Sequence, residues 1–298
     1  MAKTPQAAGS RFLPTLAILA TVGFWGLSFT SSKAVLNTGF PPLTMVCMRF
    51  IIASLILAPL YRRLEPGRGV RRQDRLPLVL SGLLGVSIYF FFESQGIKLT
   101  SASNAALIIA TIPVFTVCAE FLLNRTPIRW HQGLGIALSI LGVYFIARRS
   151  QSHFPQALLG NLCMLGACLC WVAYILISSR LKDRFSGLGL TAYQALIGAA
   201  FLLPAALLER RAWVFDNPLV WLNLLYLGLF CSALSYFLYL YGLRHLGSVV
   251  TSTYVNLIPL VGAVGGVAIL GEAFSWAQAA GGLGIIAGVF MVSLRGRG

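Results

Sequence analysis

Residues 96–145 read GIKLTSASNAALIIATIPVFTVCAEFLLNRTPIRWHQGLGIALSILGVYF, and much of this pattern recurs 146 positions later. The shift joins residues of one type without a gap: Gly96 with Gly242, Pro113 with Pro259, Trp130 with Trp276, Gln132 with Gln278, Gly135 with Gly281 and Gly142 with Gly288. It also carries Trp25 onto Trp171. Chance matches of tryptophan, glutamine and proline at one offset are rare even in an apolar chain. The sequence therefore predicts two homologous halves, residues 12–147 and 157–294, joined by a loop at 148–156.

The composition indicates a membrane protein. The chain is 57% hydrophobic and 10% charged, whereas soluble domains carry about 25% charged residues. A membrane-spanning helix needs about 20 apolar residues. Ten segments meet this length closely: 12–36, 43–61, 76–97, 102–123, 129–147, 157–180, 189–208, 219–241, 248–270 and 276–294. We therefore expect an all-α integral membrane protein with ten transmembrane helices.

The net charge of +15 is distributed as in a membrane protein. Lysine and arginine concentrate at one side of the predicted spans, most densely between Arg62 and Arg75. The positive-inside rule places that side, and both termini, in the cytoplasm. We expect a multi-pass protein of the cell (inner) membrane whose basic loops meet lipid headgroups, and we expect no nucleic-acid partner.

Each half contains an odd number of spans, so the second half must enter the membrane from the opposite side. The sequence thus predicts two inverted five-helix repeats. Secondary transporters commonly have this plan, with the substrate site near the bilayer midplane at the repeat interface.

Chemistry-bearing residues are sparse and scattered. The six cysteines lie in apolar segments, where they behave as small hydrophobic residues, and the three histidines share no metal-ligand spacing. An embedded enzyme would need a cluster of such groups at one depth. The sequence predicts no metal, no cofactor and no enzymatic activity.

Several predicted spans carry candidate substrate-binding residues at depth. Trp25 and Trp171 lie mid-span and either fill core volume or line a cavity; Ser28 and Tyr174 follow them on the same helical faces. Pro113 and Pro259 predict helix kinks in spans 4 and 9, either as plain structural kinks or at the wall of a cavity. Further candidates are aromatic or polar: Tyr89, Phe92, Asn104, Tyr236, Tyr239, Tyr254 and Asn256.

Glu93 is the most informative of these candidates, because an ionisable residue inside a span usually faces the bundle interior or a cavity. Lys33 and Arg49 are expected at a similar depth, so a structural ion pair is one interpretation. The functional alternative makes Glu93 a contact for a substrate ammonium group or a proton carrier.

The chain resembles the EamA-type drug/metabolite transporters. The resemblance is carried by these residues: Phe24-Trp25-Gly26-Leu27-Ser28, Lys33, Pro41-Pro42, Arg49, Ile112-Pro113-Val114, Gln132 with Gly135, Gln278 with Gly281, and Leu270-Gly271-Glu272. The family's Gly-Glu after span 4 is replaced by Arg125-Thr126. The resemblance implies ten helices, cytoplasmic termini and export of small metabolites. It also implies that spans 1, 3, 4, 6, 8 and 9 line a cavity that spans 5 and 10 flank.

The deep aromatic residues make the chain most similar to the aromatic amino-acid exporters of that family. This resemblance implies a secondary transporter that exports neutral or aromatic amino acids by alternating access. A passive solute channel or facilitator, and an exporter of drugs or other metabolites with the same fold, stay open as alternatives. The sequence does not determine the oligomeric state.

Overall fold

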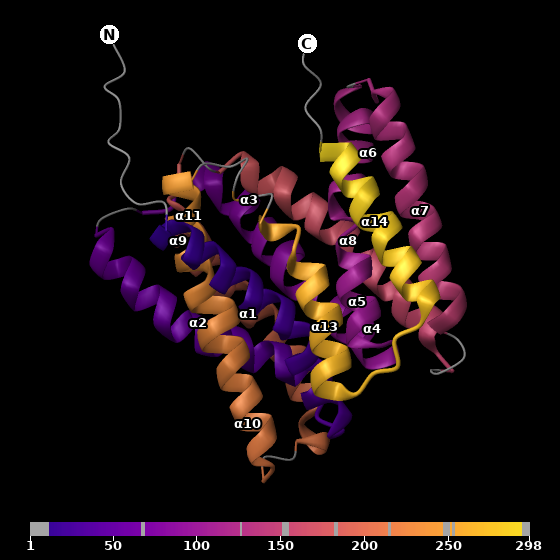
Figure 1. Cartoon of the computed structure of the whole chain (residues 1–298). Helices are drawn as coiled ribbons and strands as arrows, with labels where there is room; N and C mark the ends of the chain where they lie inside the picture. The colour runs from indigo at the N-terminus through magenta and orange to yellow at the C-terminus, as the bar shows by residue number, and fades with distance from the viewer. Residues whose placement is uncertain are drawn as a thin grey trace.

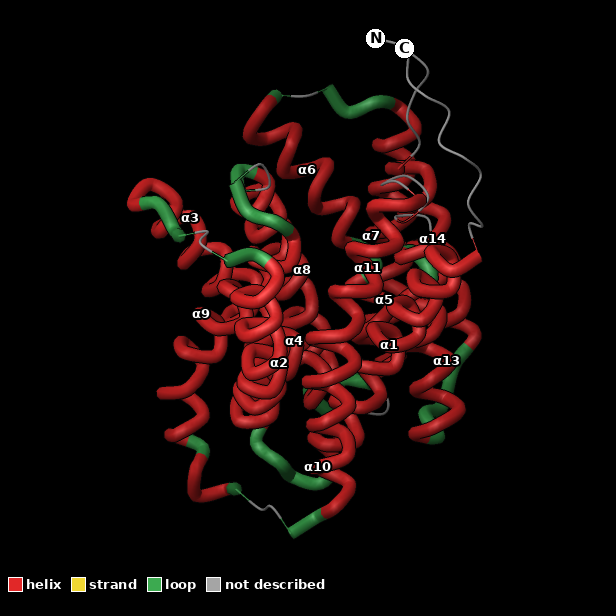
Figure 2. The backbone as a smooth tube through the Cα atoms, turned by 90° about the vertical axis from the view of Figure 1, so that its left-hand side faces the viewer, coloured by secondary structure: helices red, strands yellow, loops and turns green. Residues whose placement is uncertain are grey.

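A computed structural model describes residues 12–66, 69–125, 127–150, 155–181, 184–213, 216–246, 251 and 254–293. These residues form only helices, loops and turns (Figure 2). Both termini, and with them the prediction that they are cytoplasmic, lie outside the described residues.

The first half of the chain forms the following elements: α1 (Phe12–Asn37), α2 (Pro42–Leu64), α3 (Arg72–Gly82), the π-helical segment η1 (Leu83–Ile88), α4 (Tyr89–Leu99), α5 (Ala102–Ile109), α6 (Ile112–Asn124) and α7 (Trp130–Ser150). The second half forms α8 (Ala157–Ser179), α9 (Gly187–Leu208), the 3-10 turn η2 (Arg210–Ala212), α10 (Pro218–Leu225), the π-helical segment η3 (Tyr226–Leu234), α11 (Ser235–Leu246), α13 (Ile258–Leu270) and α14 (Trp276–Ser293). Figure 1 shows their arrangement.

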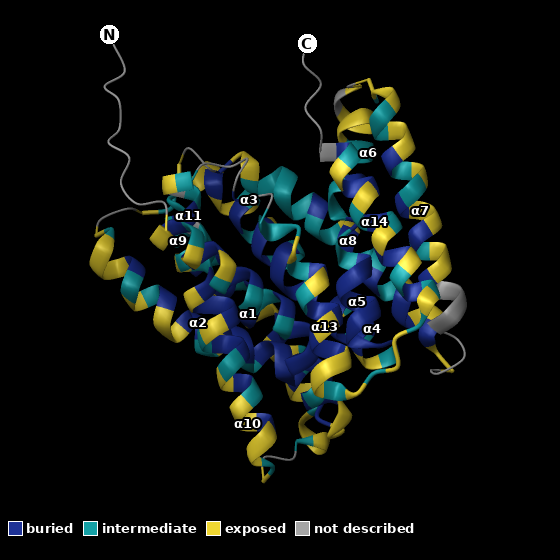
Figure 3. Ribbon diagram, viewed as in Figure 1, coloured by how far each residue is buried: buried dark blue, intermediate teal, exposed yellow. Residues whose placement is uncertain are grey.

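Seven helical segments of the described chain are long and apolar enough to cross a membrane. They coincide with predicted spans 1, 2, 3, 4, 6, 7 and 8. Spans 5, 9 and 10 correspond to shorter apolar helices, at residues 130–146, 258–270 and 276–292. Many large apolar side chains on the outer helices are exposed, including Trp130 at 79% and Trp276 at 91%, whereas buried residues gather in the centre (Figure 3). A multi-pass membrane protein explains this surface, because lipid solvates apolar side chains.

The two halves of the chain interleave. Helix α1 packs against α11 and α13 of the second half, and α8 packs against α4 and α5 of the first half. Helix α2 pairs with α9, and α7 runs beside α14 (Figure 1). Each half therefore completes the packing of the other.

Glycine permits the close approach of α7 and α14. A Cβ atom added at Gly142 would lie 2.5 Å from the carbonyl oxygen of Gly281, and one added at Gly281 would lie 2.6 Å from the carbonyl oxygen of Gly142. Small residues at membrane helix interfaces allow such backbone contact.

The two prolines break their helices more completely than a kink. Helix α5 ends at Ile109, and α6 begins at Ile112 with Pro113 in its first turn. Pro259 occupies the same place in α13, which begins at Ile258. Proline is tolerated in the first turn because its missing N–H would have no helical partner there.

Two π-helical segments occupy matched positions in the halves. The backbone N–H of Tyr89 donates to the carbonyl of Leu84, and that of Ser235 donates to the carbonyl of Phe230. Each bond spans five residues, and the two bonds are 146 positions apart. Such segments often occur at functional sites, and both precede aromatic residues that the sequence singled out.

Candidate functional site

A cavity of about 240 Å³ lies in the centre of the bundle. Its wall includes residues of α1, α2, α4, α5, α6, α8, η3, α11, α13 and α14, together with Val255 and Asn256, which precede α13. Spans 2 and 10 thus contribute to the wall, although the family resemblance implied only spans 1, 3, 4, 6, 8 and 9.

Residues at equivalent positions of the two halves line this cavity together. The pairs, each 146 positions apart, are Trp25 with Trp171, Phe90 with Tyr236, Ile109 with Val255, Ala110 with Asn256, Ile112 with Ile258, and Pro113 with Pro259. Both helix breaks therefore face the cavity, where irregular backbone in a membrane protein can be accommodated.

Nine of the residues singled out from the sequence line the cavity: Trp25, Ser28, Tyr89, Glu93, Pro113, Trp171, Tyr236, Asn256 and Pro259. The polar edges of some are already occupied by protein partners. The indole N–H of Trp25 donates to the carbonyl oxygen of Cys231 at 2.9 Å, and the Ser28 hydroxyl donates to the carbonyl oxygen of Trp25 at 2.7 Å. Trp25 is thereby fixed in orientation, and its ring is the part left for a ligand.

Aromatic contacts hold the cavity walls together. Trp25 packs against Tyr236 and Tyr239, with ring centroids 5.5 and 5.6 Å apart. Trp171 packs against Tyr89 at 4.9 Å and Tyr174 at 4.8 Å. Such pairs contribute roughly 0.5–1.5 kcal/mol each beyond their area burial. Tyr239 and Tyr174 therefore pack against the two tryptophans, but they do not line the cavity themselves.

The remaining candidates also lie outside the cavity wall. Phe92 packs near Gly166, whose added Cβ would lie 3.2 Å from the Phe92 ring, and Tyr254 is half-buried. Asn104 is buried beside a helix end, where its Oδ1 accepts a hydrogen bond from Gln278 Nε2 at 2.8 Å. The structure thus gives Asn104 a role in joining α5 to α14.

Glu93 is buried in the cavity wall, and its Oε1 accepts a hydrogen bond from the hydroxyl of Tyr89 at 2.9 Å. Lys33 does not pair with it. The Lys33 ammonium instead donates to the carbonyl oxygens of Ile97, Lys98 and Thr100, at 2.8, 3.1 and 2.6 Å. These carbonyls end α4, so Lys33 satisfies acceptors that a helix terminus leaves unpaired.

Sequence reasoning missed two polar residues of the cavity wall, besides several apolar ones. Arg49 and Ser232 both line the cavity, and Arg49 Nε donates to Ser232 Oγ at 2.7 Å. From the sequence, Arg49 is a charge at the depth of Glu93 and a part of the family resemblance, but not a candidate for the site. Its position as a charged residue inside a predicted span is the sequence signal that points to the site.

No group of three or more metal-ligating side chains occurs among the residues that the structure describes. The cavity instead combines apolar and aromatic walls with one cation and one anion. Pockets for small molecules commonly have this character.

Comparison with known proteins identifies the family of the chain. The model of the EamA-like transporter family matches it twice, at residues 13–148 and 158–294. An uncharacterized transporter of Archaeoglobus fulgidus is 29% identical over 94% of this chain and 97% of its own length. The uncharacterized transporter YetK of Bacillus subtilis is 26% identical, covering 83% of this chain and 77% of its own length. A solved crystal structure shares the fold with a TM-score of 0.66 at 20% identity, over 95% of this chain and 98% of the other. With both halves matched by one family model, the chain belongs to the EamA-like transporter family of multi-pass membrane transporters.

Proposed function

We propose that this chain is a secondary transporter that exports small metabolites, foremost neutral and aromatic amino acids, by alternating access. The observation that carries the proposal is the central cavity, whose wall pairs equivalent residues of the two halves. In this proposal ten helices form two inverted five-helix repeats in the cell membrane, with cytoplasmic termini. A substrate site at the interface of inverted repeats is the common plan of secondary transporters.

The interleaved packing supports the inverted arrangement. The contacts of α1 with α11 and α13 are repeated by those of α8 with α4 and α6, the equivalent helices of the first half. The related residues Trp130 and Trp276 begin α7 and α14 and are both largely exposed, as expected of tryptophans in the interfacial belts. Inverted repeats would place them in opposite belts.

The size and lining of the cavity support a small amphipathic substrate. Its volume of about 240 Å³ lies below the roughly 300–1,000 Å³ typical of pockets for drug-sized ligands. Trp25, Trp171 and Tyr236 offer ring faces, and Glu93 offers a carboxylate. A flat or aliphatic side chain beside an ammonium group matches this wall.

Polar bonds at one end of the bundle support a seal that must open and close. Glu272, in the loop after α13, accepts hydrogen bonds from the N–H groups of Ala102 and Ser103 at the start of α5. Lys33 of α1 is bonded to the end of α4 at the same turn. The positive-inside assignment makes this end the outer one, so export would require these bonds to rearrange.

Transport by purified protein in proteoliposomes tests the proposal. Labelled phenylalanine should enter the vesicles, unlabelled aromatic amino acids should compete, and nucleosides, sugars and cationic drugs should compete weakly. Vesicles preloaded with unlabelled phenylalanine should show accelerated counterflow. Uptake without counterflow would instead indicate a passive facilitator, and stronger competition by drugs or sugars would contradict the substrate assignment.

A further inference from the structure

Arg49 is a buried cation in the middle of the protein. It belongs to α2, is 6% exposed, and lines the central cavity. An arginine within a membrane span is costly by at least about 2.5 kcal/mol, so its position requires compensating contacts. Buried charges of this kind are normally paired or hydrogen-bonded.

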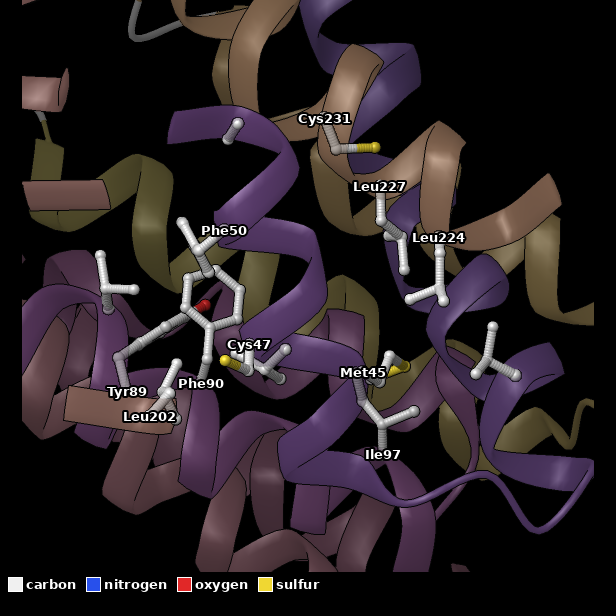
Figure 4. Close-up of a cluster of buried hydrophobic side chains, with 14 of the residues drawn as sticks. Met45, Cys47, Phe50, Tyr89, Phe90, Ile97, Leu202, Leu224, Leu227 and Cys231 are labelled. Carbon is white, nitrogen blue, oxygen red and sulfur yellow. The ribbon is translucent and has the colours of Figure 1, made fainter. Parts of the chain in front are cut away.

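The protein fixes one edge and one face of the Arg49 guanidinium. Its Nε donates to Ser232 Oγ at 2.7 Å. Its Cζ lies 4.7 Å from the ring centroid of Phe90 and 5.6 Å from that of Phe50. These two rings, labelled in Figure 4, pack against each other with their centroids 4.8 Å apart. Guanidinium groups stack favourably on aromatic faces. The group is thus held in one plane.

The other edge of the guanidinium points to a ligand. Within the described part of the chain, the structure records no hydrogen bond from the terminal nitrogens of Arg49 and no ion pair between Arg49 and an acidic residue. These terminal nitrogens are not among the fully buried side-chain atoms that lack a hydrogen-bond partner in the described residues. The nitrogens are therefore accessible from the cavity that Arg49 lines. Two parallel N–H donors in a fixed plane match the two oxygens of a carboxylate.

Glu93 supplies the opposite charge in the same wall. Its carboxylate lines the cavity with one oxygen hydrogen-bonded to Tyr89. A cavity that holds one accessible cation and one accessible anion between aromatic walls suits a zwitterion, because each substrate charge then meets an opposite protein charge. Molecules that carry only one of the two charges leave the other protein charge unpaired.

We propose that Arg49 is the carboxylate-binding residue of the site and that Arg49 and Glu93 together select zwitterionic amino acids. The substrate carboxylate binds the terminal nitrogens of Arg49, the substrate ammonium binds Glu93, and the side chain lies against Trp25 and Trp171. This inference rests on the proposed transport function and names the chemical class of its substrate.

Four ligands test the inference on the unmodified protein. Phenylalanine carries both charges, phenylalanine amide and phenethylamine lack the carboxylate, and 3-phenylpropionate lacks the ammonium. Competition against labelled phenylalanine in proteoliposomes and thermal stabilisation of the detergent-purified protein both report binding. We expect phenylalanine to bind about 10-fold or more tightly than each of the other three. Equal binding of phenylalanine and its amide would overturn the inference without any variant.

Substitution of Arg49 tests the residue itself. Arg49→Gln should weaken phenylalanine binding about 10- to 100-fold and change phenethylamine binding less than about 3-fold, because only the first ligand has a carboxylate. Arg49→Lys should recover only part of the loss, since an ammonium lacks the planar fork. Arg129→Gln is the matched control: this arginine is exposed in the loop immediately before α7, and its substitution should leave both affinities unchanged.

The outcomes separate this inference from the proposed function. The role of Arg49 is overturned if folded Arg49→Gln protein loses the same affinity for phenylalanine and for phenethylamine. It is also overturned if the variant keeps both affinities unchanged. In either case the proposed transport of amino acids stands. If the unmodified protein binds 3-phenylpropionate but no amino acid, and Arg49→Gln abolishes that binding, the carboxylate site stands and the amino-acid assignment fails. If the unmodified protein binds no carboxylate-bearing ligand, the carboxylate site is refuted.

Discussion

Glu272 is predicted to contribute strongly to the stability of the bundle. Its carboxylate accepts hydrogen bonds from the N–H of Ala102 at 2.6 Å, the N–H of Ser103 at 3.0 Å and the hydroxyl of Ser103 at 2.6 Å. Ala102 is 0% exposed and Ser103 is 1% exposed, so water does not reach these groups. The carboxylate also lies at the positive end of the α5 dipole.

The magnitude follows from the groups left without a partner. Glu272→Ala removes the acceptor of two buried N–H groups, each worth about 1–3 kcal/mol, so the variant should lose about 2–6 kcal/mol of unfolding free energy. Glu272→Gln keeps one acceptor oxygen and should lose roughly half of that. Ser101→Ala removes a single bond, from the N–H of Asn104 at 3.0 Å, and should lose about 0.5–2 kcal/mol.

Denaturation of the purified variants in mixed micelles measures these differences, and the melting temperature gives a second readout. Glu120→Ala is the matched control, because Glu120 is an exposed acid near the end of α6. The expected order of stability is Glu120→Ala above Ser101→Ala above Glu272→Gln above Glu272→Ala. If Glu272→Ala and Glu120→Ala unfold at the same denaturant concentration, the hydrogen bonds that Glu272 accepts from the start of α5 contribute no net stability, and the reasoning fails.

Three further predictions concern packing and the site. Gly142→Ala should lower the unfolding free energy by about 1–3 kcal/mol, whereas Gly133→Ala, where an added Cβ meets nothing within 4 Å, should not; equal melting temperatures would contradict this. Trp25→Ala and Trp171→Ala should each weaken phenylalanine binding about 2- to 10-fold in competition assays, and unchanged affinities would exclude a stacking role. Glu93→Gln should reduce phenylalanine uptake about 10-fold; an unchanged rate and pH profile would refute both its ammonium contact and its role as a proton carrier.

The helical, membrane-spanning character of the fold could be predicted from sequence because it depends on local composition. Long apolar runs specify α1, α2 and α8 without knowledge of their neighbours. The helix breaks could also be partly predicted from the sequence, because Pro113 and Pro259 lack a backbone N–H and their rings clash with the preceding turn of a continuing helix. The structure showed that each proline starts a new helix where the sequence had predicted a kink.

The details of the site were less accessible because they depend on residues far apart in the chain. Arg49 is anchored by Ser232, which is 183 positions away, and no periodicity in α2 or η3 reports that bond. Asn104 had the chemistry of a substrate contact, but its amide oxygen binds Gln278, 174 positions away. The equivalence of Trp25 and Trp171, which both line the cavity, could be predicted only because the repeat revealed it.

The π-helical segments η1 and η3 have a consequence for insertions and deletions. An α-helix turns by about 100° per residue, so one residue accommodated in a widened turn changes which side chains point inward beyond it. Deleting a single residue from η1 would let the segment relax to an ordinary helix and swing Tyr89, Phe90 and Glu93 off the cavity together. The number of residues in these two segments, as much as their identity, therefore determines which side chains line the cavity.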